Sequence, residues 1–151
     1  MVLKNMSNNI ERIIINGKLL AIILRANFKK EGVEFFTPAD YTQQLAYMNR
    51  PKGYIIKAHM HNAVKREILF TRETLLIRSG KIRVDFYCNN KEYAESRILQ
   101  GGDVLLIVGG GHGFEFIEAG EMIEVKQGPY FEEKDAVKFE PVSKSQLKVK
   151  E

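Results

Sequence analysis

The chain has little cysteine, little histidine and no long apolar run. Its 151 residues include one cysteine, Cys88, so no internal disulfide can form and a disulfide-stapled secreted domain is excluded. No apolar run approaches the roughly 20 residues that a membrane helix needs. The N-terminal stretch lacks the basic and apolar regions of a secretory leader. We therefore expect a cytoplasmic protein with no membrane partner.

The chain also lacks a cluster of charge of one sign. It carries 23 Lys and Arg against 19 Asp and Glu, a formal net charge of +4. The basic residues are scattered among the acids, whereas nucleic-acid binding needs clustered basic charge together with stacking aromatics. We expect no nucleic-acid partner, while a small negatively charged substrate remains compatible with the charge.

The pattern of the chain predicts one all-β domain over residues 1–151. Its ordered body is expected at residues 10–140, with loose ends at 1–9 and 143–151. From Tyr54 onward the apolar residues alternate with period two, and short runs are separated by Ser79-Gly80, Asn89-Asn90, Gly101-Gly102, 109–111, Gly120 and Gly128-Pro129. Many short strands at such turn spacing indicate a sandwich or a barrel.

Two local signals stand before this region. Asn16-Gly17 separates two aliphatic runs, which predicts an N-terminal β-hairpin. Thr37 followed by Pro38 and Asp40 resembles a helix start, and Pro51 lies beyond it. We therefore expect one short helix near residues 38–48.

The three histidines carry the strongest chemical signal. His59 and His61 are two residues apart in the strand-like run "GYIIKAHMH", so both side chains would point to one face. Glu73 starts the next apolar run, and His112 lies in a glycine cluster farther along the chain. Three imidazoles and one carboxylate would leave open positions on a metal such as Zn²⁺ or Fe²⁺. The alternative is that these histidines bind no metal.

These motifs resemble those of the cupin superfamily. In the first motif a glycine is followed by five residues and H-x-H, then by a glutamate seven positions before a second glycine, and the chain has Gly53, His59, His61, Glu73 and Gly80. In the second motif a glycine and an apolar strand lead through a turn to a histidine, as in "GDVLLIVGGGHGFEF". The resemblance implies a jelly-roll barrel, the cupin double-stranded β-helix, around a divalent metal ion bound by His59, His61, Glu73 and His112.

The chain departs from the family's pattern at three points. The gap from His61 to Glu73 is longer than usual, so Glu67 is a rival for the carboxylate ligand, although the distance to Gly80 favours Glu73. Val108 stands where a proline is usual, and His112 falls one residue early in its turn. The freedom of glycine accommodates that shift.

The resemblance also implies a function. The segments "VKREILFTRETLLIRSGKIRVDFY" and "GGGHGFEFIEAGEMIEVKQGPY" are similar to small cupin proteins associated with bacterial surface-polysaccharide biosynthesis. The implied activity is an isomerase or epimerase acting on a nucleotide-activated sugar, with Zn, Fe, Mn or Ni as the metal. The alternatives are a non-catalytic metal-dependent protein that binds a sugar or another small molecule, and a metal-dependent oxygenase.

Five further residues are candidates for binding a sugar-like ligand. Arg83 and Tyr87 share one face of "KIRVDFY", opposite Ile82, Val84 and Phe86, and would bind a ligand only if that face looks inward. Phe114 shares parity with His112, and Lys126 and Tyr130 lie near a strand end. The aliphatic runs "RIII" and "LLAIIL" would either pair with a second copy in a homodimer or complete the chain's own sheet.

Overall fold

The computed structural model describes residues 9–150, apart from the side chains of Glu132 and Glu133. Contacts divide the chain into two units, one formed by residues 1–28 and 71–151 and the other by residues 29–70. We call them the barrel unit and the arm unit. The expected loose N-terminal residues 1–8 lie outside the described part. The single-domain organisation stays a prediction.

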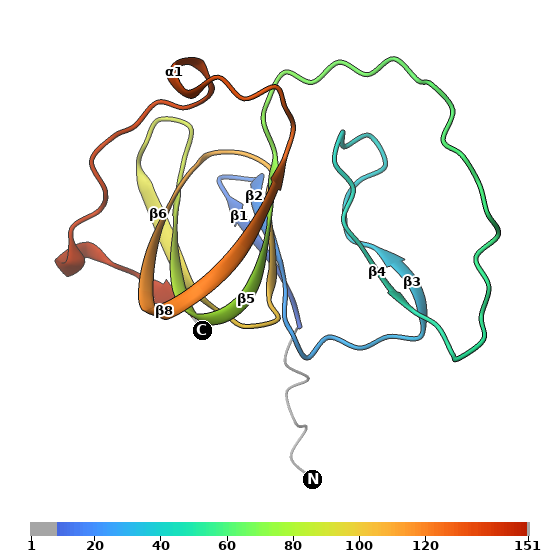
Figure 1. Cartoon of the computed structure of the whole chain (residues 1–151). Coiled ribbons are helices and arrows are strands. Elements are labelled where there is room, and N and C mark those ends of the chain that lie inside the picture. Colours follow the sequence, from blue (N-terminus) through green and yellow to red (C-terminus); the bar gives the residue numbers. More distant parts are fainter. Residues whose placement is uncertain (1–8, 151) are drawn as a thin grey trace, which may run out of the picture. The chain divides into compact units, whose positions relative to one another are not determined.

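The barrel unit contains a curled, mixed sheet (Figure 1). Its strands are β1 (Ile10–Ile15), β2 (Lys18–Leu24), β5 (Glu73–Tyr87), β6 (Tyr93–Gln100), β7 (Val104–Ile107), β8 (Gly111–Lys126) and β9 (Val149–Lys150). The order is β1-β2-β7-β5-β6-β9, with β8 paired to β5. All these pairs are antiparallel except β6 with β9. The all-β prediction is therefore confirmed for this unit.

The predicted N-terminal hairpin is confirmed. β1 pairs with β2 around Asn16-Gly17, whose φ angles are 51° and 74°. Two consecutive positive φ angles are what a type I′ turn requires, and its twist matches that of the strands. β2 is buried between β1 and β7, so both aliphatic runs complete the chain's own sheet.

The core lies on the concave face of this sheet. Its side chains come from β1, β2, β5, β6 and β7, with Phe114 and Met122 of β8 packed against it. On β5 the core-facing parity changes, because Leu75 and Ile77 precede Gly80 while Ile82, Val84 and Phe86 follow it. The bulges between Ile77 and Ile82 produce this change.

The predicted turns at Ser79-Gly80 and Gly120 are wrong, because both lie inside long strands. A Cβ on Gly80 would stand 2.3 Å from the Ala119 carbonyl oxygen, and one on Gly120 would stand 2.3 Å from the Ser79 carbonyl oxygen. Gly80 also has a φ of +79°. The glycines therefore allow two bulged backbones to approach closely where the ribbon bends, and neither glycine ends its strand.

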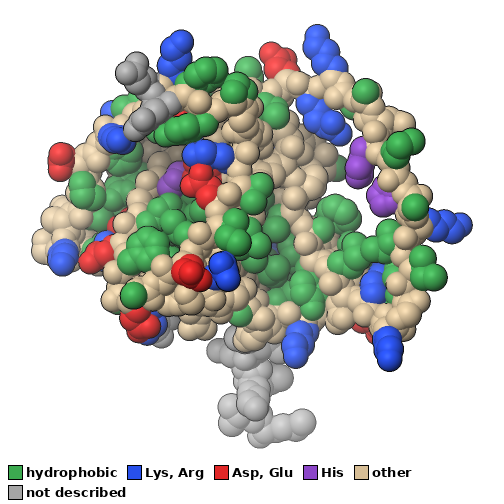
Figure 2. Space-filling view, viewed as in Figure 1, with side chains coloured by type: hydrophobic (Ala, Val, Ile, Leu, Met, Phe, Trp, Pro, Cys, Tyr) green, Lys and Arg blue, Asp and Glu red, His purple; other side chains and the backbone are tan. Residues whose placement is uncertain are grey.

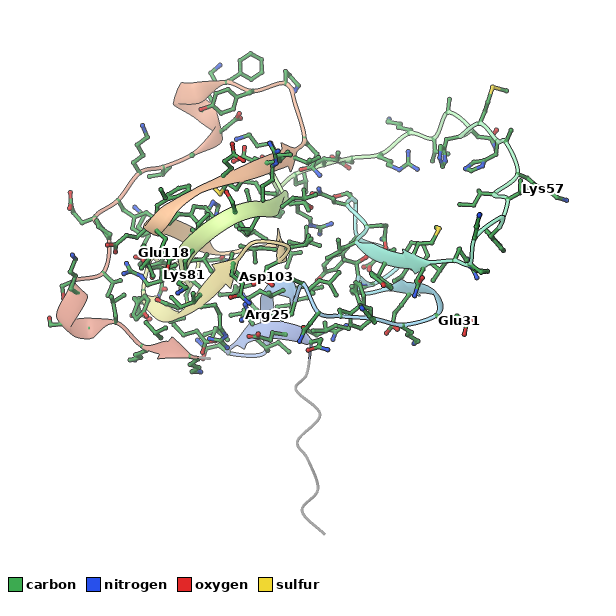
Figure 3. All side chains as sticks on the ribbon, turned by 60° about the horizontal axis from the view of Figure 1, so that its bottom comes forward. Arg25, Glu31, Lys57, Lys81, Asp103 and Glu118 are labelled. Atoms are coloured by element: carbon green, nitrogen blue, oxygen red, sulfur yellow. The ribbon has the colours of Figure 1, made fainter. Side chains whose placement is uncertain are left out.

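Two charged pairs contrast buried and exposed electrostatics (Figure 3). Asp103 is 1% exposed and accepts hydrogen bonds from the Arg25 side chain at 2.8 Å and from the Ala26 amide at 2.9 Å. Lys81 and Glu118 pair across β5 and β8 at 2.9 Å with both side chains largely exposed. The first pair fixes the end of β2 against the β6–β7 turn, while the second is solvated.

The arm unit contains one hairpin, formed by β3 (Gly32–Phe35) and β4 (Ala46–Asn49). The helix predicted at 38–48 is wrong, because side-chain hydrogen bonds organise this stretch as a loop. The Gln44 side chain donates to the carbonyl oxygens of Pro38 and Tyr41, at 2.9 and 2.8 Å. Thr37 Oγ1 accepts from the Leu45 amide instead of capping a helix. Such side-chain bonds compete with those of a helix.

The strand predicted at 53–61 is also absent from the described structure. Residues 54–69 have no regular secondary structure, and many of their apolar side chains are exposed. Figure 2 shows hydrophobic side chains standing out along this segment, and Met60 is 94% exposed. The apolar alternation of "GYIIKAHMH" thus has no strand partner within the arm unit.

The C-terminal segment differs from the loose end expected at 143–151. After α1 (Glu132–Asp135), a 3₁₀ turn η1 (Lys144–Gln146) leads to β9, which pairs with β6. Part of this segment is therefore attached to the sheet.

Candidate metal centre

Glu73 and His112 meet although they lie at opposite ends of the β5–β8 ribbon. The pairing runs from Glu73 opposite Lys126 to Phe86 opposite His112. A flat ribbon would separate these ends by about 40 Å at roughly 3.3 Å per residue. In the curled ribbon, Glu73 Oε2 and His112 Nε2 are 3.0 Å apart. Two residues that the sequence predicts for one site are therefore brought together.

The faces of the strands explain the contact. Glu73 shares the parity of Leu75 and Ile77, which face the core, and His112 is paired with the core residue Phe86. Both side chains consequently point to the concave face. They remain partly open to solvent, with 16% of the Glu73 side chain and 26% of the His112 side chain exposed.

Electrostatics keep the Glu73 carboxylate ionised. The hydrogen bond from His112 lowers the pKa of Glu73, partial burial opposes this effect, and Lys126 lowers the pKa further. Lys126 Nζ lies 3.8 Å from Glu73 Oε1 and 2.7 Å from Glu124 Oε1. The bond to Glu124 raises the pKa of Lys126. Because an ionised carboxylate can only accept hydrogen bonds, His112 Nε2 carries the hydrogen of this bond. The other ring nitrogen, Nδ1, takes no part in it.

Phe114 and Lys126, two of the residues predicted to bind a ligand, lie beside this pair, and Tyr130 lies beside Lys126. The Phe114 ring lies 5.4 Å from the His112 ring. Lys126 Nζ lies over the Tyr130 ring, 4.7 Å from its centroid. Sequence reasoning missed Glu124, although it shares strand parity with His112 and Lys126. The carboxylate–imidazole pair therefore has one cation, Lys126, and one aromatic ring, Phe114, as direct neighbours.

Arg83 and Tyr87 are not brought to this cluster. Arg83 pairs with Glu115 and Tyr87 with Gly111, so both side chains lie on the convex face, opposite His112. Arg83 is engaged by Asp85 at 2.8 Å and by Glu115 at 2.6 Å. Tyr87 is 3% exposed and its hydroxyl accepts from the Val142 amide. The sequence predicted that Arg83 and Tyr87 would bind a ligand only if their face of β5 looked inward. This face looks away from the concave side, so neither residue lies beside His112.

His59 and His61 lie in the arm unit. Their ring centroids are 5.3 Å apart, so the two imidazoles are neighbours even without a strand. His59 Nδ1 is 2.8 Å from the Lys57 carbonyl oxygen, which leaves Nε2 for other partners. Glu67 is also in the arm unit, whereas Glu73 contacts His112 in the barrel unit. The predicted residues thus form two pairs, one in each unit.

The Glu73–His112 pair fits two adjacent ligands of one divalent ion. Zinc binds imidazole nitrogen and carboxylate oxygen at about 2.1 Å. Two such ligands are about 3.0 Å apart at a right angle and about 3.4 Å apart at the tetrahedral angle that zinc prefers, which follows from the same bond length. The observed separation is 3.0 Å, which is also the length of the hydrogen bond between the two groups. Within residues 9–150 no group of three or more His, Cys, Asp or Glu is close enough to hold a metal. The barrel unit therefore brings one imidazole and one carboxylate together.

Comparisons with protein-family models, with curated protein sequences and with solved structures find no match for this chain. Among the described residues, no helix is both long and apolar enough to cross a membrane.

Proposed function

We propose that this protein is a metal-binding cupin whose ion is held by His59, His61, Glu73 and His112. The observation that carries the proposal is the 3.0 Å separation between Glu73 Oε2 and His112 Nε2. For this pair to become two ligands of one ion, the imidazole hydrogen must move from Nε2 to Nδ1, so that a neutral ring binds through Nε2. The adjacent imidazoles of His59 and His61 supply the remaining pair of donors.

The free edge of β8 supports closure of the sheet into a jelly roll. Within the described structure β8 pairs with β5 alone, so its other edge has no strand partner. Residues 54–61 of the arm unit alternate in polarity and have no strand partner either.

The residues around the ion would bind and orient a substrate. A bound divalent ion polarises a carbonyl oxygen and thereby acidifies the neighbouring C–H group. The Lys126 ammonium attracts an anionic group, and Phe114 offers a ring face for stacking on a sugar or a base. These features fit the nucleotide-activated sugar that the resemblance implies. We therefore propose an isomerase or epimerase of surface-polysaccharide biosynthesis.

The same pair suggests how a proton would move in a metal-free variant of this chemistry. Glu73 accepts from His112 Nε2 and fixes the imidazole so that Nδ1 is the free basic nitrogen. This nitrogen would take the proton from a C–H beside the substrate carbonyl and return it to a neighbouring carbon. An imidazole that is bound to metal through Nε2 carries its hydrogen on Nδ1 instead, so the two roles exclude each other.

We also propose a homodimer formed through β1. Within residues 9–150 β1 pairs with β2 alone as a strand, and Ile14 on β1 is 55% exposed. Two copies of the chain would then pair through β1. Light scattering should give twice the chain mass of 17.3 kDa. A monomeric mass over the micromolar range would refute this assembly.

Bound metal and solvent exchange together test the activity. The purified protein is assayed for metal and then incubated with nucleotide-activated sugars in deuterated water. Deuterium at a ring carbon supports the isomerase. Oxygen consumption with ferrous iron supports the oxygenase instead, and saturable sugar binding without exchange supports a sensor. Absence of metal combined with deuterium exchange would favour the His112 base.

A further inference from the structure

The C-terminal residues 139–150, which we call the strap, are tied to the convex face of the sheet. Most side chains of the strap are exposed. The three that are partly buried are Phe139, Val142 and Leu147. The Val142 amide donates to the Tyr87 hydroxyl at 3.0 Å, and the Lys148 amide donates to the Tyr93 hydroxyl at 2.8 Å. β5 and β6 thus present two tyrosines that hold the strap's backbone.

The far end of the strap continues the sheet. β9 pairs with β6, the Ser96 amide donates to the Lys148 carbonyl oxygen at 2.9 Å, and Lys150 pairs with Glu95. Between the two attachments lies a cleft of about 740 Å³, lined by residues of the strap together with Glu92 and Tyr93. The strap is therefore attached mainly at its two ends.

The attachment of the strap near Tyr87 contacts Gly111, the residue before His112. A Cβ on Gly111 would stand 3.0 Å from Phe139 Cζ and 3.3 Å from Tyr87 Cβ. The Phe139 ring also meets the Tyr87 ring edge-on, with centroids 5.1 Å apart. Gly111 is paired with Tyr87, and His112 is paired with the core residue Phe86. Phe139 therefore packs on the convex face of the strand that directs His112 to the concave face.

The start of β8 has few side chains of its own to hold it. Glycines occupy positions 109, 110, 111 and 113, so His112 is the only residue of 109–113 with a side chain. A run of glycines loses more conformational entropy on ordering than other residues do. External packing must compensate for this loss. The Tyr87 and Phe139 side chains provide that packing at Gly111.

We propose that Phe139 is a positioning residue for His112, and that the strap thereby holds the proposed metal ligand within reach of Glu73. This inference deepens the proposed function, on which its metal-binding consequence rests. Its structural consequence does not depend on metal, because the His112–Glu73 bond exists without it. Removal of the Phe139 ring should let residues 109–113 move and lengthen the distance from His112 Nε2 to Glu73.

Three variants test this inference: Phe139→Ala, Phe139→Leu and the control Val137→Ala. Val137 precedes the strap by two residues and is 74% exposed. The metal-free proteins are compared by hydrogen exchange of the amides of residues 111–116 and by the nitrogen resonances of the His112 ring. Zinc affinity is then titrated. Exchange at Leu75 and Ile82 reports whether the core remains intact.

We expect Phe139→Ala to speed exchange at the start of β8 and to change the His112 ring signal, with the core amides unaffected. Zinc affinity should fall about 10-fold to 100-fold, as it does when groups that orient ligands are removed. Phe139→Leu should restore most of the His112 ring signal and most of the zinc affinity. Val137→Ala should match the wild type. If Phe139→Ala unfolds the core, the milder variant Phe139→Leu is used instead. A shifted His112 ring signal with an intact core then supports the positioning role, and a wild-type signal overturns it.

Wild-type exchange and an unchanged His112 signal in Phe139→Ala would overturn the positioning role. A core that loosens in both Phe139 variants, with no excess effect at residues 111–116, would also overturn it. Absence of zinc binding in the wild-type protein would refute the proposed function alone. The measurements on the metal-free protein would still decide the role of Phe139.

Discussion

The Glu73 carboxylate and the His112 imidazole are hydrogen-bonded at 3.0 Å although 38 residues and the full length of the β5–β8 ribbon separate them. The contact exists because the ribbon bends where Gly80 and Gly120 let the two strands touch. In the proposed metal site, this carboxylate and this imidazole on the concave side of the sheet would supply two of the four ligands. The adjacent rings of His59 and His61 would form the other half.

The two histidines of the arm unit should each be needed for metal binding. His59→Ala or His61→Ala should lower metal affinity by at least about 10-fold, because removal of a direct ligand costs no less than removal of a group that only orients one. The fold should survive, since both side chains are exposed. Metal content after dialysis, with circular dichroism as the control for folding, measures this. Full metal occupancy in both variants would show that the arm unit supplies no ligand.

The carboxylate ligand should be Glu73 and not Glu67. Glu73→Gln keeps the size of the side chain but removes its charge, so zinc affinity should fall at least about 10-fold. Glu67→Gln is a matched control, because Glu67 is exposed and lies in the arm unit. Isothermal titration with zinc compares the two variants. A larger loss in Glu67→Gln would reverse the assignment.

The bend at Gly80 should be intolerant of a side chain. Gly80→Ala places Cβ 2.3 Å from the Ala119 carbonyl oxygen at a φ of +79°, so it should lower the free energy of unfolding by more than about 3 kcal/mol. Gly17→Ala is the control, because its φ is +74° but no atom lies within 4 Å of the new Cβ. That variant should lose only about 1 to 2 kcal/mol. Urea unfolding measures both, and equal losses would show that the close approach is not tight.

The buried pair of Asp103 and Arg25 should matter far more than the exposed pair of Lys81 and Glu118. Asp103→Ala leaves the Ala26 and Gln100 amides without their acceptor and removes one partner of the Arg25 guanidinium, which keeps Glu11 and the Ile98 carbonyl oxygen. It should therefore lower the free energy of unfolding by more than about 2 kcal/mol, because unsatisfied buried groups are costly. Glu118→Ala should change it by less than about 1 kcal/mol. Thermal and urea unfolding of both variants provide the comparison. Similarly small losses of unfolding free energy in the two variants would mean that the Asp103 hydrogen bonds do not stabilise the fold.

Local sequence signals predicted the parts of the fold that depend on local chemistry. The Asn16-Gly17 hairpin forms because two neighbouring residues accept positive φ angles. The parity of Phe114 with His112, and of Ile82 with Val84 and Phe86, follows from the pleat of a strand. These faces are as the sequence predicts, and they place His112 on the concave side, whereas Glu73 is placed there by the change of parity between Ile77 and Ile82.

The errors come from contacts between distant residues. Gly80 and Gly120 carry the same signal as a turn glycine, and only the partner strand shows that they mark a bend. The Thr37-Pro38 helix start was overridden by the Gln44 side chain, which bonds to carbonyl oxygens of its own loop. The role of Tyr87 was hidden because its partner, the Val142 amide, is 55 residues away. None of these contacts leaves a periodic pattern in the sequence.

The chain contains three histidines, so their ring nitrogen resonances test the central claim most directly. Nitrogen-15-labelled protein is titrated with zinc, and the three imidazoles are followed together. The account predicts that His59, His61 and His112 all shift and that the change is complete at one equivalent of metal per chain. Zinc-induced shifts at His112 without shifts at His59 and His61, or no shifts at any of the three, would contradict it.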